Sequence, residues 1–140
     1  MNRLQYLICA KTQYNIQSPF LFDLYQNVLA PKLDSSTLKI YGIAKKDRFA
    51  QLHFKLANHY NAKDTPEFSA LNGTDVLLAT NDGCLIGMMN HPYSSKNSEE
   101  RWHNLVKEQS VTLSVDLYDI GLVFTSKLLS KQHLLFREFL

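Results

Sequence analysis

The chain has 140 residues, of which 45% are hydrophobic and 20% are charged, a composition typical of one globular domain that excludes a disordered chain. The formal net charge of +2 comes from scattered basic residues, and the densest cluster, residues 45–48, is interrupted by an acid, so we expect no nucleic-acid partner. No apolar run is long enough to span a membrane, and the first residues lack the apolar core of a signal peptide, so we expect a cytoplasmic protein without a membrane partner.

The first part of the chain carries helical patterns. Residues 4–10 form a short amphipathic segment. Ser18 and Pro19 are typical of a helix start, with Ser18 as the N-cap and Pro19 at the first helical position, and Pro31 ends this helix. Its apolar residues fall on one face: Phe20, Leu21, Leu24, Tyr25 and Val28.

A second helix is predicted beyond residues 38–43, an apolar segment that is too short to assign. Asp47 is a suitable cap for this helix, and His53 falls within its apolar stripe. We interpret His53 as a half-buried member of the stripe, with a ligand role as the alternative. The stripe consists of Phe49, Leu52, His53, Leu56 and Tyr60.

After residue 60 the pattern changes from helices to strands. Asn72 and Gly73 mark a turn, and residues 75–80 (DVLLAT) form a continuous apolar strand of the kind that is buried on both faces. Residues 81–83 (NDG) are a strong turn signal that leads into a second apolar run, residues 84–89. Two apolar strands joined by so few residues predict an antiparallel hairpin.

The last part of the chain predicts one helix and three more strands. The helix covers residues 98–106, and Trp102, Leu105 and Val106 supply its apolar face. Residues 111–116 alternate with period two, residues 120–124 are apolar, and residues 133–139 fit a last edge strand. We therefore expect one α/β domain over residues 1–140, mainly helical up to residue 60 and then a small mixed sheet with one helix.

Three segments resemble a group of class I S-adenosylmethionine-dependent methyltransferase-like proteins common in Bacteroidetes. They are "AKTQYNIQSPFLFDLYQNVL", "RFAQLHFKLANHYNAK" and the closing block "SSKNSEERWHNLVKEQSVTLSVDLYDIGLVFTSK" with "KQHLLFREFL". In the closing block a helix, a Trp, a valine-rich strand, a "DLYDIGLVF" hairpin and a final "FR" follow in order. The resemblance implies a Rossmann-like methyltransferase fold and S-adenosylmethionine as the cofactor.

The middle of the chain departs from that family where the cofactor would bind. The resemblance places Glu67 at the acid that ends the first central strand and Gly73 at the last glycine of the Gly-rich turn, but Ser69 replaces the first glycine. Pro66 breaks what would be a parallel central strand. No room remains for the strand–helix units that would carry the ribose-binding acid. We expect a truncated fold in which residues 67–73 form an ordinary loop, with weak cofactor binding by Glu67, Ser69 and Gly73 as the alternative.

The stretch "NHPYSSKNSEERWHNL", residues 90–105, is rich in reactive side chains. In the resembled family this segment carries two acids followed by a His, and here Asn90, His91 and Tyr93 stand at those positions. Without the two carboxylates there is no ligand set for a hard cation, so we expect no metal site. The stretch is interpreted as a capped, solvated helix start, with an active site at Asn90, His91 and Tyr93 as the alternative.

Two functional hypotheses follow. The first is a non-catalytic methyltransferase-like domain without a cofactor that acts through protein contacts, and the second is an S-adenosylmethionine-dependent methyltransferase with an abbreviated pocket. The apolar strands at 75–80 and 84–89 lack charges or proline that would protect a sheet edge, so we expect a homodimer on the truncated side of the sheet. Cys9 and Cys84 form no CxxC pair, which excludes a metal finger and indicates two buried free thiols.

The patterns also predict a buried core. Its members are Phe20, Leu24, Phe49, Leu52, Leu56, Val76, Leu78, Leu85, Trp102, Val115, Leu122 and Phe124.

Overall fold

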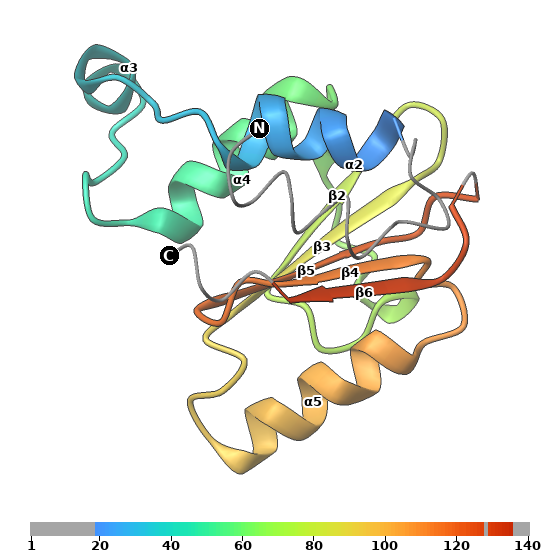
Figure 1. The fold of residues 1–140 in the computed structure, drawn as a ribbon. Coiled ribbons are helices and arrows are strands. Elements are labelled where there is room, and N and C mark those ends of the chain that lie inside the picture. Colours follow the sequence, from blue (N-terminus) through green and yellow to red (C-terminus); the bar gives the residue numbers. More distant parts are fainter. Residues whose placement is uncertain (1–18, 128, 136–140) are drawn as a thin grey trace. The chain divides into compact units, whose positions relative to one another are not determined.

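The computed structural model describes residues 19–127 and 129–135. The chain divides into two compact units, Met1–His59 and Tyr60–Leu140. The first unit contains the helices α2, α3 and α4, and the second contains a six-stranded sheet with helix α5 (Figure 1). The fold is therefore mixed α/β, with helices first and a mixed sheet after them, as the sequence predicts.

Helix α2 (Pro19–Leu24) continues as a π-helical turn, η2 (Tyr25–Leu29), which ends before Pro31, as predicted. Pro19 is the first residue that the structure describes, so a helix start at this residue stays a prediction. Ser18 and the amphipathic segment at residues 4–10 lie outside the described residues. The predicted apolar face is buried at Leu21, Leu24, Tyr25 and Val28.

Helix α3 (Ser35–Ile40) settles the segment that the sequence leaves ambiguous. Asp34 is its N-cap, since the carboxylate accepts a 2.7 Å hydrogen bond from the Thr37 N–H. Helix α4 (Arg48–His59) begins directly after Asp47, whose carboxylate accepts from the Ala50 N–H at 3.0 Å. The predicted cap at Asp47 is confirmed. His53 is half-buried in the stripe.

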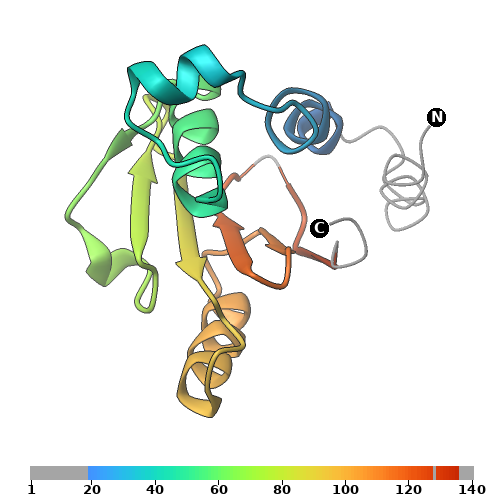
Figure 2. The same cartoon turned by 90° about the vertical axis from the view of Figure 1, so that its left-hand side faces the viewer.

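The sheet of the second unit has the strand order β1-β2-β3-β5-β4-β6. Strands β4 and β6 pair in parallel, and the other neighbours pair antiparallel. The opposite directions of β2 and β3 can be followed in Figure 2. The strands are β1 (Lys63–Asp64), β2 (Val76–Ala79), β3 (Leu85–Asn90), β4 (Leu113–Asp116), β5 (Ile120–Phe124) and β6 (Gln132–Leu135). β6 is an edge strand among the described strands, as predicted from residues 133–139, of which residues 136–139 are not described.

The hairpin of β2 and β3 is confirmed. The strands pair antiparallel around a turn in which Gly83 has φ +88°, a conformation that glycine adopts without strain. The premise that these apolar strands form an open edge is wrong. β2 lies between β3 and β1, and β1 presents the exposed Lys63 and Asp64 at that edge, which are the charges that discourage edge pairing.

Helix α5 (Lys96–Lys107) starts slightly before the predicted residue 98, because Ser95 is its N-cap and accepts from the Ser98 N–H at 3.1 Å. β3 and β4 both pair antiparallel with β5 and therefore run parallel to each other. α5 connects these two parallel strands, and β5 is inserted between them. The unit β3–α5–β4 is thus a crossover connection of the α/β type.

The core prediction is right for the centres of the elements and wrong for their beginnings. Phe20, Phe49, Val76 and Leu85 are only half-buried. Phe49, Val76 and Leu85 each lie at the first or second position of their helix or strand, where fewer residues of the same element surround the side chain. The buried members of the predicted core are Leu24, Leu52, Leu56, Leu78, Trp102, Val115, Leu122 and Phe124.

Candidate functional site

The predicted site residues Asn90, His91 and Tyr93 lie where the chain leaves β3. The Asn90 N–H donates to Asp75 Oδ2 at 2.7 Å, and the His91 N–H donates to the carbonyl of Asp119 at 2.8 Å. His91 is exposed and has φ +50°, whereas Tyr93 is half-buried. The loop after β3 is therefore held to its neighbours through its backbone, and of the three side chains only that of Tyr93 makes a described hydrogen bond.

Asp116 is a buried carboxylate that the sequence patterns do not single out. It ends β4, is fully buried, and accepts hydrogen bonds from the hydroxyl of Tyr93 and from the Tyr118 N–H, the latter at 2.8 Å. The rings of Tyr93 and Tyr118 stack with centroids 5.6 Å apart and an interplanar angle of 13°. We call Tyr93, Asp116 and Tyr118 the Asp116 cluster. Its signal in the sequence is the "DLYD" turn, because Asp accepts from the backbone two residues further on.

The Asp116 cluster joins the loop after β3 to the turn after β4. A buried carboxylate needs donors to replace water, and each oxygen of Asp116 has one. A tyrosine hydroxyl paired with a carboxylate is a proton donor and acceptor in many active sites. Here the pair holds two loops at the same end of β3 and β4, which is the end where ligands bind in open α/β sheets.

Tyr118 forms a tight and strained turn. It has φ +74°, and the Asp119 N–H donates to the carbonyl of Leu117 at 3.0 Å, so the three residues form a γ-turn with a positive φ at its centre. The Tyr118 side chain is 57% exposed. Strain of this kind persists where the surroundings hold it, and here the stacked ring of Tyr93 and the carboxylate of Asp116 hold it.

A serine–histidine pair lies between β4 and β6. Ser114 Oγ and His133 Nδ1 are 2.6 Å apart, and the two residues are direct partners in the strand pairing. The His133 ring centroid lies 6.3 Å from that of Trp102, whose Nε1 is buried without a hydrogen-bond partner among the described residues. A serine next to a histidine has the geometry of an activated nucleophile. Ser114 is 1% exposed, however, so the pair acts here as a fastening of β6 to β4.

The second predicted set, Glu67, Ser69 and Gly73, lies between β1 and β2. Glu67 and Ser69 are exposed, and Ser69 belongs to a 3₁₀ turn, η3 (Phe68–Ala70). Gly73 has φ +101°, and a Cβ atom there would lie 2.8 Å from Cγ of Arg101. Gly73 therefore serves a turn that passes close to α5, in agreement with the loop interpretation.

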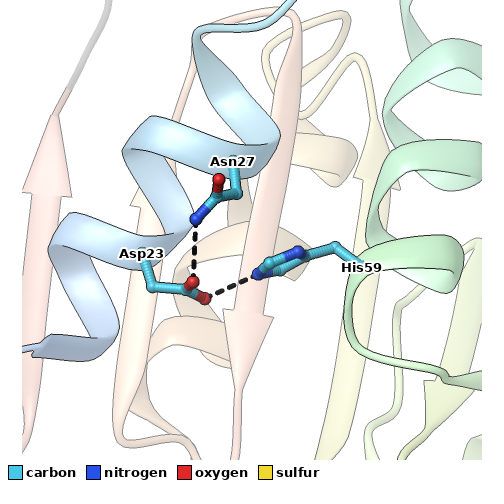
Figure 3. Close-up of polar contacts among 3 residues, drawn as sticks. All are labelled: Asp23, Asn27 and His59. Carbon is cyan, nitrogen blue, oxygen red and sulfur yellow. Dashed lines mark hydrogen bonds and ion pairs between the residues drawn. The ribbon is translucent and has the colours of Figure 1, made fainter.

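A third polar group, also missed, lies in the helical unit (Figure 3). His59 Nε2 lies 2.8 Å from Asp23 Oδ2, and the Asn27 side-chain amide donates to Asp23 Oδ1 at 2.9 Å. The contact joins the end of α4 to α2. It fixes the orientation of the imidazole as a carboxylate does in many histidine sites. No sequence signal relates Asp23 to His59, because they are 36 residues apart.

Metal ligation has no geometric support in the described ranges. No group of three or more His, Cys, Asp or Glu side chains that could hold a metal ion occurs among residues 19–127 and 129–135. His53 therefore belongs to no such group of metal ligands. Cys84 is a free, half-buried thiol, and burial raises its pKa. Cys9 lies outside the described residues.

Comparison with known proteins gives no relative from which a function could be transferred. No protein-family model, no curated protein and no solved structure matches the chain. In the described part of the chain, no helix is long and apolar enough to cross a membrane.

Proposed function

We propose that the chain is a truncated, Rossmann-like methyltransferase relative that acts through protein contacts and neither binds S-adenosylmethionine nor transfers a methyl group. The observation that carries this proposal is the antiparallel course of β1, β2 and β3. A Rossmann cofactor site needs a parallel strand, a Gly-rich turn and a helix whose N-terminus faces the cofactor. In this chain residues 65–75 lead from β1 through η3 directly into the antiparallel strand β2.

The crossover unit β3–α5–β4 supports the Rossmann-like part of the proposal, because crossovers between parallel strands build such folds. The contact part is supported by exposed apolar side chains at one end of the sheet. Tyr118 is 57% exposed and Leu135 is 45% exposed. Leu135 is the strand partner of Asp116, whose carboxylate binds the Tyr118 N–H, so these two apolar side chains belong to neighbouring segments.

The proposed contact is a homodimer. We expect its surface at β6 and no longer at the apolar strands β2 and β3. The edge at β1 carries charged residues, whereas β6, the other terminal strand among those described, carries Leu135. Pairing of β6 with its copy around a two-fold axis would cover Leu135 and Tyr118 together. The free, half-buried thiol of Cys84 fits a reducing compartment, and we therefore place the protein in the cytoplasm.

A second candidate function is a methyltransferase with an abbreviated pocket that binds S-adenosylmethionine. The observation in its favour is the position of the Asp116 cluster at the end of β3 and β4 where α/β sheets bind ligands. In that reading Tyr93 and Asp116 would bind the cofactor or transfer a proton, and Glu67, Ser69 and Gly73 would not take part.

Isothermal titration with S-adenosylmethionine and S-adenosylhomocysteine decides between the two candidates. The contact proposal expects no saturable heat. A saturable isotherm that is lost in Tyr93→Phe would establish the second candidate and refute the first.

Light scattering at micromolar concentration tests the dimer separately. The wild-type chain should have twice the monomer mass, and Leu135→Lys should convert it to the monomer, because the new charge lies on the edge strand. Phe68→Lys, which changes an exposed aromatic residue between β1 and β2, is the matched control and should leave the dimer intact. A wild-type chain with the mass of a monomer would contradict the proposed homodimer.

A further inference from the structure

The helical unit carries an exposed apolar tip with lysines around it. Ile40, at the end of α3, is 76% exposed, and Tyr41, directly after it, is 61% exposed. Lys39, Lys45 and Lys46 are also exposed. We call these five residues the α3 tip. Exposed apolar side chains that adjoin each other mark interaction surfaces more often than single ones do.

The local structure of α3 holds the α3 tip in this exposed position. Leu38 is buried, and Ile40, two residues further along the helix, points to the opposite side. Gly42 ends the helix with φ +66°, and the Ile43 N–H donates back to the Leu38 carbonyl at 2.9 Å. The Tyr41 ring packs against Phe54, with centroids 4.6 Å apart. The exposure of Ile40 and Tyr41 thus results from a capped helix and not from a loose loop.

The charge on the α3 tip is positive and available for a partner. The acids nearest in sequence bind helix N–H groups and form no ion pair with these lysines, since Asp34 accepts from the Thr37 N–H and Asp47 from the Ala50 N–H. No ion pair of Lys39, Lys45 or Lys46 occurs within the described ranges. Basic residues beside exposed apolar ones are complementary to a surface that is both anionic and able to take up apolar side chains.

The shape of the α3 tip favours a lipid surface over a peptide. A Cβ atom placed on Gly42 would meet no other atom within 4 Å, so the backbone at the tip is open to solvent. Peptides are recognised by grooves or by sheet edges, and an exposed helix end with open space around its backbone provides neither, whereas it can rest on a flat surface. At a bilayer surface, isoleucine enters the headgroup layer, tyrosine prefers the interface, and lysine side chains extend towards lipid phosphates.

We propose that the α3 tip attaches the protein reversibly to anionic phospholipid membranes, with Ile40 and Tyr41 in the headgroup layer and Lys39, Lys45 and Lys46 at the lipid phosphates. The expectation of no membrane partner rests on the lack of a spanning segment, and a surface contact needs far fewer apolar residues. This inference goes beyond the proposed contact function and does not depend on it, since the residues involved lie outside the sheet unit.

Vesicle flotation of the whole chain tests the proposal. The protein should float with vesicles of phosphatidylcholine mixed with phosphatidylglycerol, should stay behind with pure phosphatidylcholine, and should dissociate as salt is added. The double variant Lys45→Glu/Lys46→Glu should bind roughly tenfold or more weakly, from the contribution of each basic residue near an anionic surface. Ile40→Ser should bind roughly tenfold more weakly, because it removes the apolar insertion without touching the Tyr41–Phe54 contact.

Matched variants separate the α3 tip from the charge of the whole chain. Lys63→Glu/Lys127→Glu makes the same change in net charge at exposed positions of the sheet unit, and Phe68→Ser removes an exposed apolar side chain there. Both should bind vesicles like the wild-type chain. The proposal is overturned if the wild-type chain does not float with anionic vesicles, or if the control variants lose binding as much as the tip variants. Binding of soluble polyglutamate through Lys45 and Lys46 without vesicle binding would also overturn it and would favour an acidic protein partner.

Discussion

The face of the sheet that α5 covers has two halves of opposite character. Around β2, β3 and Trp102 it is apolar, with Leu77, Met89 and Val123 buried in one cluster with the indole. Around β4 and β6 the same face carries Ser114 and Asp116, which are the strand partners of Val123 and Gly121 and therefore point to the same side.

The stability of the two halves depends on different interactions. In the apolar half the space between side chains limits which residues fit, because a Cβ atom on Gly121 would lie 2.5 Å from Cζ3 of Trp102. In the polar half the limit is the number of hydrogen-bond partners, because Asp116 and Ser114 are buried and each is bonded to a side chain on a neighbouring segment. The comparison teaches that the apolar half should be sensitive to volume and the polar half to the loss of single donors.

The largest effect is expected from Trp102→Ala. The indole is completely buried against Gly121, so its removal should lower the free energy of unfolding by about 3–5 kcal/mol, as for other large core aromatics. Urea denaturation followed by circular dichroism measures this. Trp102→Phe should cost much less, because it keeps a ring and removes an N–H group that has no partner among the described residues. An unchanged free energy of unfolding of Trp102→Ala would contradict the assignment of the apolar half.

Gly121→Val should destabilise the fold by about 3 kcal/mol, since side-chain atoms would overlap the indole in a close-packed region. The same measurement on the double variant Gly121→Val/Trp102→Ala should show that the two effects are not additive, because the cavity left by the indole accommodates the valine. Additive effects would mean that Gly121 is needed for a reason other than its contact with Trp102.

In the polar half, Tyr93→Phe should cost about 2 kcal/mol, the usual contribution of a hydrogen bond to a charged group, because the ring and its stacking on Tyr118 remain. Asp116→Asn combined with Tyr93→Phe should show strong coupling in a double-mutant cycle. Independent effects of the two substitutions would separate Tyr93 from Asp116 and break the distinction between the halves.

Ser95→Ala should cost about 1 kcal/mol through loss of the N-cap of α5, the helix that covers both halves. Helix content and denaturation midpoint measure the effect. Ser94→Ala is the control and should be nearly neutral, because the Ser94 hydroxyl makes an exposed hydrogen bond to Ser98 and the substitution leaves the backbone hydrogen bond of Ser94 in place. An equal effect of both would exclude Ser95 as the cap.

The smallest effect concerns Cys84, which precedes Leu85 at the margin of the apolar half. Burial raises the pKa of its thiol in the folded chain above the unfolded value. Its contribution to stability is therefore present below the unfolded pKa and is lost as the pH rises through the folded pKa. In a Cys9→Ala background, Cys84 should react more slowly with iodoacetamide than glutathione does at mildly alkaline pH, and should become fully reactive in urea. Equal rates in the folded state would contradict the burial of Cys84.

The features that short stretches of sequence specify could be predicted. Asp47 marks a helix start and Gly83 marks the hairpin turn, because each acts through its own backbone or through an N–H a few residues away. The cap at Asp34 belongs to the same class and could have identified α3. The residues predicted for the site, by contrast, lie in two short stretches, residues 67–73 and 90–93, and only Tyr93 belongs to the Asp116 cluster.

The amino-acid sequence by itself determined the type of most elements, the hairpin and the burial of residues at the centres of elements. The tertiary structure alone decided that β5 inserts between β3 and β4, that β1 covers β2, and that Asp116 meets Tyr93. The physical reason is range: capping and periodicity act over a few residues, whereas strand order and buried polar pairs depend on segments far apart in the chain. The pairs Asp23–His59 and Ser114–His133, separated by 36 and 19 residues, exist only once helix packing and strand register have formed.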